Sequence, residues 1–474
     1  MKKILRSCIF AVMAIALLPA GTLAQERRDK EQTYVLEHPY EVTKITPPQG
    51  KKIKNVILMI GDGMSLMHVY SAWTANRGKL FLDNCQAVGL SKTYCANKLI
   101  TDSGAGGTAL ATGQKTIYHA VGVDPEGRPL KSLVDLAAAK GKSTGLAVTC
   151  RLWDATPADF CCHNIDRDAE AAIVADYVNC NADYVFGGGA KLFENREDGR
   201  DLFAELRAKG FQTPRSWEDL VTIKSGKVFA VPYSVDTPLP AERGDLLARA
   251  SLKGIELLNQ NKNGFFMMIE GSQLDDYGHF NDLDLLMQET HDFDRTIGEI
   301  YKWAVQDGET LVIVTADHET GGIGLGIKDS NLPISLLQKQ KVSEENLSNI
   351  LYQLKERKSS PSWEDAKEIL KKNLGLWEYI PVSYSEEAEL MRIFDASFIS
   401  KRAKDITNLY STVGPLTNAA ISLINQKAHI GWTSNNHTGA VVPVYVIGAE
   451  QGQFSGRLDN TDIPNTIRKI TGIK

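Results

Sequence analysis

The 474-residue sequence has few cysteines, no excess of basic residues and no long apolar run beyond its N-terminal segment. None of the seven cysteines falls in a zinc-finger spacing, which argues against a small zinc module or a disulfide-dense scaffold. Lys and Arg total 53 against 58 Asp and Glu, so a nucleic-acid partner is not expected. A hydrophobic content of 43% with 23% charged residues is typical of a folded globular protein.

The N-terminal segment has the pattern of a secretory signal peptide. Basic residues precede the apolar run 8–18, and Ala24 ends a Thr-Leu-Ala sequence that suits cleavage. The run is too short to span a bilayer. We therefore expect residues 1–24 to be removed and 25–474 to be exported, to the periplasm or outside the cell, without a transmembrane anchor.

Export makes disulfides plausible, because removing the segment with Cys8 leaves six of the seven cysteines in an oxidising compartment. Cys85 and Cys95 flank a candidate hairpin, and we predict that they pair. The pairing of the other four stays open. For the adjacent Cys161 and Cys162 we favour a structural use over a catalytic thiol.

Apolar segments that end in polar or glycine-rich turns recur along the chain, at Val56–Ile60, 143–149, 184–189, 265–272, 311–322 and Val444–Ile447. Helical patterns lie between them, for example over Leu130–Lys140 and Gly244–Leu258. Continuous apolar strands that alternate with helices predict an α/β three-layer sandwich, with a central mostly parallel sheet and helices on both faces. In such a sheet the binding crevice lies beyond the carboxyl ends of the strands.

Residues 329–428 interrupt this alternation. They are rich in Lys, Glu, Ser and Leu, with helical spacing in "SEENLSNILYQLKER" and "SWEDAKEILKKNL". The charged runs are typical of solvated helix faces. We predict a helical cap inserted between two strands of the main sheet.

One serine stands out in "ITDSGAGGTALATGQKT", where Gly, Ala and Thr follow Ser103 with nothing bulky for several residues. This pattern suits a flexible loop or a closely packed helix, and it also suits an exposed nucleophile at a helix start. Asp62 lies between two glycines at a strand end, where it could simply shape a turn or serve as a ligand.

Carboxylates and histidines follow the other strands. The Asp275–His279 interval in "IEGSQLDDYGHF" puts both side chains on one side of a helical turn. Taken singly, each such residue has a simpler structural explanation, such as a surface ion pair or a buried histidine. Together they are too many for one ion and predict a two-metal site with mixed zinc ligands and an oxygen-only position for magnesium; the set is Asp62, Glu270, Asp275, His279, Asp317, His318 and His437.

The ordered set "GDGMS", "TDSGAGGTALATG", "DATPA", "EGSQLDDYGH", "TADHETGG" and "HTG" resembles the alkaline phosphatase family from about Asn55 to the C-terminus, apart from the insertion. The resemblance implies a phosphomonoesterase that acts on small phosphate monoesters, carries two zinc ions and one magnesium ion, and forms a homodimer. It also implies a phosphoserine intermediate with retention at phosphorus.

Matched by position, Ser103 resembles the family's nucleophile and Arg167 its phosphate-binding arginine. The remaining matches are ligands: Asp275, His279 and His437 resemble those of the first zinc, Asp62, Asp317 and His318 those of the second, and Asp62, Thr156 and Glu270 those of magnesium. The Thr156-Pro157 pair also suits a helix start.

Two positions depart from the family pattern. Asp276 stands where relatives often have Lys, His or Trp, and an added acid should weaken phosphate attraction; Asp154 is one of several residues that relatives use beside the magnesium site.

The alternative functions are those of a phosphodiesterase or another hydrolase of the superfamily, although "SGAGG" lacks the sulfatase pattern, and of a metal- or phosphate-binding protein without turnover.

Overall fold

The computed structural model describes residues 39–46, 52–194, 196–328, 330, 332–399 and 414–473. The predicted signal peptide, 1–24, lies outside the described residues.

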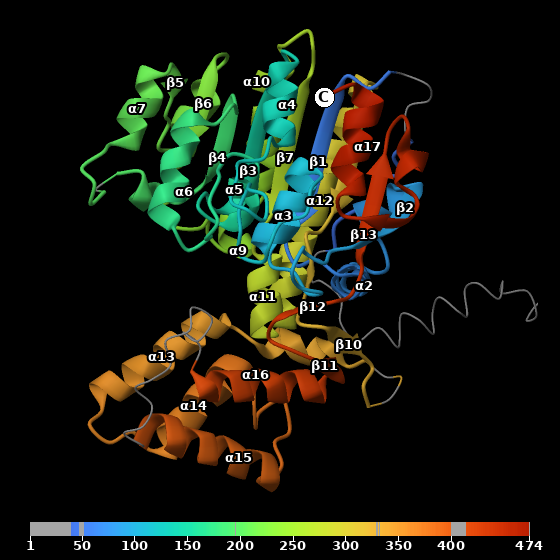
Figure 1. Ribbon diagram of the computed structural model, residues 1–474. Coiled ribbons are helices and arrows are strands. Elements are labelled where there is room, and N and C mark those ends of the chain that lie inside the picture. The colour runs from blue at the N-terminus through green and yellow to red at the C-terminus, as the bar shows by residue number, and fades with distance from the viewer. Residues whose placement is uncertain are drawn as a thin grey trace, which may run out of the picture.

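A ten-stranded sheet forms the centre of the molecule (Figure 1). Its strands lie in the order β14 (Gly456–Asp459), β2 (Ala87–Lys92), β13 (Val442–Ile447), β8 (Thr310–Thr315), β1 (Asn55–Gly61), β7 (Phe265–Gly271), β3 (Ser143–Arg151), β4 (Tyr184–Gly188), β6 (Lys227–Ala230) and β5 (Phe211–Gln212). Strand β13 runs antiparallel to β2 and β8, and the other printed pairings of this sheet are parallel. The predicted mostly parallel sheet is confirmed.

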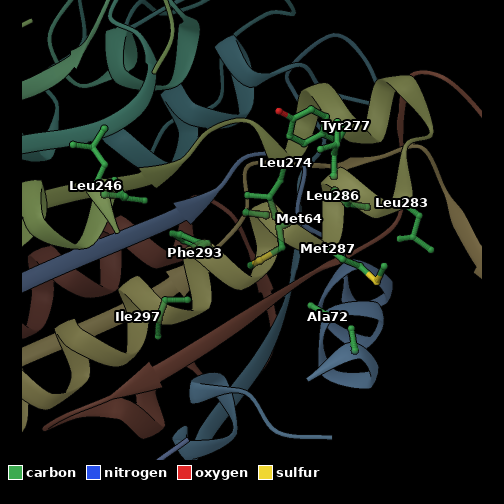
Figure 2. Packing of buried hydrophobic residues seen from close by; sticks show 14 of the residues in the cluster. Met64, Ala72, Leu246, Leu274, Tyr277, Leu283, Leu286, Met287, Phe293 and Ile297 are labelled. Atoms are coloured by element: carbon green, nitrogen blue, oxygen red, sulfur yellow. The ribbon is translucent and has the colours of Figure 1, made fainter. Parts of the chain in front are cut away.

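Helices cover both faces because each central strand is apolar on both sides. In β1, Ile57 and Met59 join one buried cluster, whereas Leu58 joins the other. The first cluster is completed by α2 (Leu66–Ala75), α10 (Leu246–Leu258) and α12 (Leu283–Asp307), whose packing Figure 2 shows. The second is completed by α3 (Ser103–Thr112), α4 (Leu133–Ala139), α6 (Glu170–Asp176), α7 (Leu202–Ala208) and α17 (Asp462–Thr471).

Two predicted helices begin later than their patterns suggested. Helix α4 begins at Leu133 rather than Leu130, because the Ser132 side chain caps it by accepting from the Asp135 amide. Helix α10 begins at Leu246, after Gly244 adopts a left-handed φ of 60°. In both cases local backbone chemistry decided the boundary.

A group of helices lies below the sheet in Figure 1, between β10 (Ile323–Leu325) and β11 (Ile430–Trp432). These two short strands pair antiparallel, so the chain leaves and re-enters at one place. The helical elements are η4 (Ile334–Lys339), α13 (Glu344–Arg357), α14 (Trp363–Leu374), α15 (Tyr384–Phe394), η5 (Asp395–Ile399) and α16 (Pro415–Lys427). The boundaries 329–428 of the cap stay a prediction.

Short elements connect these parts: η1 (Phe81–Asn84), α5 (Ala155–Asp159), η2 (Tyr177–Asn179), η3 (Ala190–Leu192), α8 (Trp217–Thr222), α9 (Pro240–Arg243), α11 (Leu274–Phe280), β9 (Glu319–Thr320), β12 (His437–Thr438) and η6 (Gln451–Phe454). Strands β9 and β12 pair with each other beside the main sheet.

The predicted Cys85–Cys95 disulfide is wrong: the disulfide in the structure joins Cys161 to Cys180, and both Cys85 and Cys95 are free thiols. Strand β2 lies between the two cysteines, and its six residues separate them by roughly 20 Å at about 3.3 Å per residue. Disulfide-bonded Cα atoms lie less than about 7 Å apart. Two cysteines at opposite ends of one extended strand therefore cannot pair.

Candidate active site at the carboxyl edge of the sheet

The register of three adjacent parallel strands brings the predicted ligands to one edge. Ile60 of β1 pairs with Glu270 of β7 on one side and with Thr315 of β8 on the other. The three strands therefore end together, and the residues that follow them, including Asp62 and Asp317, emerge at the same level.

Ser103 is the first residue of α3 and is 2% exposed. Asp102 caps the helix by accepting from the Ala105 amide at 3.3 Å. The Ser103 Oγ lies 3.1 Å from His318 Nε2. The serine is thus held at a buried helix start and not in a loose loop.

The small residues after Ser103 allow close approach of other segments. A Cβ on Gly106 would lie 2.8 Å from the Asp317 carbonyl oxygen, and one on Gly107 would lie 2.2 Å from Asp159 Oδ2. Both distances are shorter than a real Cβ contact. Glycine is therefore needed for α3 to pack against the turn after β8 and against α5.

Asp62, Asp317 and His318 form one group of potential metal ligands. His318 Nε2 lies 3.3 Å from Asp317 Oδ2 and 3.6 Å from Asp62 Oδ1. Both of those carboxylate oxygens are buried, and neither has a hydrogen-bond partner within the described structure. Burial and the neighbouring carboxylates raise the pKa of Asp62 well above its usual range, and raise that of Asp317 to about 7.

Asp275, His279 and His437 lie beside this group. His279 Nε2 is 3.2 Å from Asp275 Oδ2 and 3.1 Å from His437 Nε2, and His437 Nε2 is 3.6 Å from Asp275 Oδ1. Burial opposes ionisation of Asp275, but the surrounding imidazoles outweigh it and hold the pKa of this carboxyl well below its usual range. Burial likewise opposes protonation of His279, yet Asp275 raises the pKa of this imidazole to about 9.

Backbone carbonyls orient both imidazoles. The Nδ1 of His279 lies 2.7 Å from the Asn435 carbonyl oxygen, and that of His437 lies 2.9 Å from the Thr101 carbonyl oxygen. A carbonyl only accepts, so Nδ1 carries the hydrogen in each ring and donates. The Nε2 atoms are left facing the site, as in histidines that bind metals.

An oxygen-rich corner lies on the other side of Asp62. The Thr156 hydroxyl donates to Asp62 Oδ2 at 3.3 Å. Glu270 is 1% exposed, and burial followed by the charge of Asp154 raises the pKa of its carboxyl well above the usual range. The thiol of Cys150 lies 3.7 Å from Glu270 Oε2. Hard divalent cations prefer oxygen donors of this kind.

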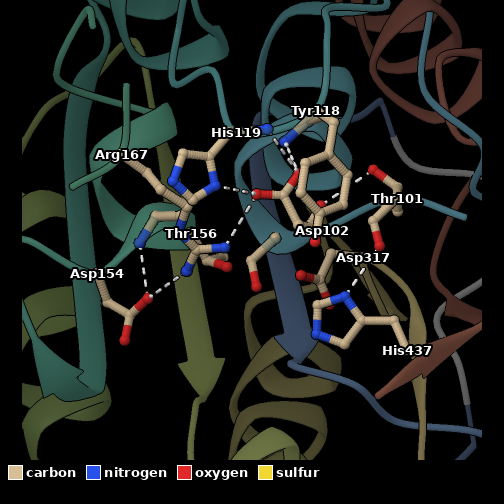
Figure 3. A network of polar contacts seen from close by, with 12 residues as sticks. Thr101, Asp102, Tyr118, His119, Asp154, Thr156, Arg167, Asp317 and His437 are labelled. Carbon is tan, nitrogen blue, oxygen red and sulfur yellow. Dashed lines mark hydrogen bonds and ion pairs between the residues drawn. The ribbon is translucent and has the colours of Figure 1, made fainter. Parts of the chain in front are cut away.

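Arg167 faces the site from the loop before α6 and is held by two carboxylates (Figure 3). Its Nη1 donates to Asp102 Oδ2 at 3.1 Å, and its Nη2 donates to Asp154 Oδ1 at 3.2 Å. A guanidinium fixed in this way is suited to bind a phosphoryl group through its planar set of donors. All the predicted site residues therefore lie around this edge of the sheet.

The predicted set omitted Asp102 and Thr320. Asp102 precedes the nucleophile candidate in "TDSG", and an Asp before a helix start is a recognisable cap signal. The Thr320 hydroxyl donates to Asp275 Oδ1 and lies 3.2 Å from His318 Nδ1, so it supports both groups of ligands. Nothing in its local sequence distinguishes this threonine from others.

Buried carboxylates and imidazoles around a serine, at the carboxyl ends of parallel strands, define a metal-dependent hydrolase. The family model described as "Alkaline phosphatase" matches residues 53–473. The chain belongs to the alkaline phosphatase family and is a phosphomonoester hydrolase.

The relatives agree with this assignment. "Alkaline phosphatase 4" of Bacillus subtilis (strain 168) is 31% identical over 98% of this chain and 97% of its own. The cold-active alkaline phosphatase of a psychrophilic Shewanella is 30% identical, with a TM-score of 0.74 over 88% of this chain and 99% of that one. A histidine-to-aspartate variant of TAB5 alkaline phosphatase, solved with Mg bound, is 27% identical, with a TM-score of 0.65 over 90% of this chain and 99% of that one. Among the described residues, no helix has the length and apolar character of a membrane span.

Proposed function

We propose that the protein hydrolyses phosphate monoesters through a phosphoserine on Ser103, at a site that holds two zinc ions and one magnesium ion. The observation that carries the proposal is the position of Ser103, whose Oγ lies 3.1 Å from His318 in the middle of the buried ligand groups. A serine hydroxyl is a weak nucleophile near neutral pH, and such surroundings are what it needs to react.

The donor atoms fit the proposed ions. The unpaired buried oxygens of Asp62 and Asp317 would be costly without a cation, since a buried charge needs a partner. Mixed carboxylate and imidazole donors suit zinc, and the oxygen-only corner suits magnesium. The proposed assignment is Asp275, His279 and His437 for the first zinc, Asp62, Asp317 and His318 for the second, and Asp62, Thr156 and Glu270 for magnesium.

When bound, these cations would neutralise phosphoryl charge and lower the pKa of nearby hydroxyl groups. The magnesium assignment also draws support from the TAB5 variant that was solved with Mg bound.

The proposed reaction has two displacements at phosphorus. In the first, the Ser103 Oγ forms a bond to phosphorus while the ester oxygen leaves as the alcohol. In the second, a water oxygen bonds to phosphorus, the Oγ–P bond breaks, and Ser103 regains its hydrogen as inorganic phosphate departs. Each displacement inverts phosphorus, so the overall result is retention.

Arg167 would bind two phosphoryl oxygens during both displacements. Asp102 and Asp154 orient its guanidinium before substrate arrives, so little of its rotational freedom is left to lose on binding. The N-terminus of α3 adds backbone N–H groups, which favour an anionic group beside Ser103.

The test is Ser103→Ala, compared with the parent enzyme under saturating zinc and magnesium. We expect the parent to trap radiolabelled phosphate on Ser103 when quenched in acid, and the variant to trap none and to lose about 1,000-fold or more in kcat. Ser71→Ala is the matched control, because the Ser71 hydroxyl donates to the Met67 carbonyl oxygen of its own helix, at 2.7 Å. A Ser103→Ala enzyme with the parent rate would refute the covalent route.

Metal analysis and a substrate comparison complete the test. We expect two zinc ions and one magnesium ion per chain, and faster turnover of an aryl phosphate monoester than of the matching diester. A preference for the diester would favour the phosphodiesterase alternative. Export from the cytoplasm and homodimer formation stay predictions from the sequence.

A further inference from the structure

Arg151 is a second half-buried arginine near the site, and the resemblance to the family gave it no role. It is the last residue of β3, and its side chain is 26% exposed. Its Nη1 lies 3.1 Å from Asp236 Oδ2, and its Nη2 lies 3.2 Å from Asp154 Oδ2. The Arg151 amide also donates to Asp236 Oδ1 at 2.7 Å, so Asp236 fixes both its backbone and its guanidinium.

Asp154 is shared between the two arginines. Its Oδ2 contacts Arg151, and its Oδ1 accepts from Arg167 Nη2 at 3.2 Å and from the Ala155 amide at 2.7 Å. Because both oxygens are engaged, this carboxylate cannot rotate without losing a partner. Since Asp154 divides its negative charge between two arginines, it attracts Arg167 less strongly than it would without Arg151, and Arg167 can bind a phosphoryl group. Figure 3 shows the Arg167 side of this arrangement.

Arg151 also balances the negative charge in this region. Asp154 and Asp236 contact it, and the charge of Asp154, followed by that of Asp236, raises the pKa of its guanidinium. Without Arg151, Arg167 would face these acids alone, and a dianionic phosphoryl group would meet a more negative site.

We propose that Arg151 is a positioning residue for phosphoryl recognition, which holds Asp154 and offsets the surrounding acids so that Arg167 stays available to substrate and product phosphate. Arg151 acts through Asp154 and does not touch the reacting atoms. The inference depends on the proposed role of Arg167.

The experiment uses the full-length, metal-loaded enzyme with Arg151→Gln and Arg151→Lys, and measures kcat, KM and the inhibition constant of inorganic phosphate. For Arg151→Gln we expect KM and the inhibition constant to rise about five- to tenfold together, the size expected for losing one partly buried charge, while kcat stays within about threefold. Arg151→Lys keeps the charge but not the two-sided contact, so it should show about a two- to threefold rise.

A double-mutant cycle separates positioning from a general structural effect. If Arg151 acts through Asp154, the effect of Arg151→Gln on the inhibition constant should shrink to about twofold or less in an Asp154→Asn background. Arg200→Gln is the matched control, since Arg200 makes an exposed ion pair with Glu205. Metal content and melting temperature are recorded for every variant.

Unchanged KM and inhibition constant in Arg151→Gln would overturn the inference. So would a loss of kcat alone, or an undiminished effect in the Asp154→Asn background. If Arg151→Gln does not fold, Arg151→Lys decides in the same way, because an unchanged inhibition constant there also contradicts the proposal. Failure of the proposed function is distinguishable, since it would show in the parent and in Ser103→Ala whatever residue occupies position 151.

Discussion

The molecule buries acidic side chains at the edge of the sheet and again at the base of the helical insertion, and the two places differ in what surrounds the acids. At the sheet edge, Asp62 and Asp317 have unpaired oxygens but lie against His318. At the base of the insertion, Glu344 of α13 is 1% exposed and neither of its oxygens has a hydrogen-bond partner in the described structure. The neighbouring charge there is another acid, Asp282 at the start of α12.

This contrast shows that a buried, unpaired carboxylate is not by itself a functional site. The sheet edge adds imidazoles with oriented Nε2 atoms, a serine at a helix start and a fixed arginine. Its acids are therefore part of a set of groups that is suited to bind cations and a phosphoryl group. At the insertion base, burial and Asp282 raise the pKa of Glu344 to about 9, which keeps that carboxyl protonated near neutral pH. The donor set at the sheet edge is suited to bind cations, whereas Glu344 lowers the stability of the protein as pH rises.

Metal removal should have the largest effect, and it should act on the acids at the sheet edge and not on Glu344. Chelation leaves the acids at the sheet edge to repel one another, so we expect about a 100-fold or larger loss of activity and a lower melting temperature. Readdition of zinc and magnesium should restore both quantities. Activity and calorimetry before and after dialysis against a chelator measure both effects. Unchanged activity and melting temperature would contradict the claim that the acids at the sheet edge bind cations.

Arg167→Lys should have the next largest effect. A lysine keeps the charge but cannot contact Asp102 and Asp154 while presenting a planar pair of donors to phosphate, so we expect kcat/KM to fall about 10- to 100-fold. Steady-state kinetics on an aryl phosphate measure this. Arg128→Lys, in an exposed ion pair with Asp124, is the control, and equal losses in the two variants would contradict the assigned role.

Glu344→Gln tests the acid at the insertion base. The folded state keeps the Glu344 proton up to a pKa of about 9, whereas the unfolded state loses it near pH 4.3, so parent stability falls as pH rises through this window. Glutamine removes that dependence, and we expect the variant to be more stable by on the order of 2 kcal/mol at pH 7. Its kcat/KM should match that of the parent.

Melting temperatures of Glu344→Gln and parent at pH 5 and pH 8 provide the measurement. The difference between the two proteins should widen at the higher pH. Glu345→Gln is a matched control, because Glu345 is the exposed neighbour in the same helical turn. A difference that is independent of pH would show that Glu344 ionises normally.

Ser362→Ala should have the smallest effect and concerns the insertion alone. Ser362 caps α14 by accepting from the Asp365 amide, while Asp365 accepts from the Ser362 amide at 2.8 Å. Loss of such a cap costs about 1 kcal/mol of stability. Thermal unfolding should show a small decrease with unchanged kcat, and the exposed Ser359→Ala should change neither. A fall in kcat would show that a change in the insertion affects the candidate active site.

Much of the architecture could be predicted from short stretches of the sequence. Strands buried on both faces are continuous apolar runs, so Val56–Ile60 identified β1 almost to the residue. The pattern around Ser103 left a loop and a helix open, although the aspartate before it suits the cap with which α3 begins. The serine-patterned starts of α13 and α14 follow from the same chemistry.

Other features depended on which segments pack together. Cys161 pairs with Cys180, and Arg151 shares Asp154 with Arg167, through contacts between side chains that no local pattern relates. Propensity and periodicity act over a few neighbouring residues, so by itself the sequence determined the apolar central strands, the presence of the helices between them and the types of ligand available. Only the tertiary structure decided which carboxylates meet an imidazole or an arginine and which, like Glu344, are buried without one, because partners distant in the chain meet only when the sheet and its helices close around a common core.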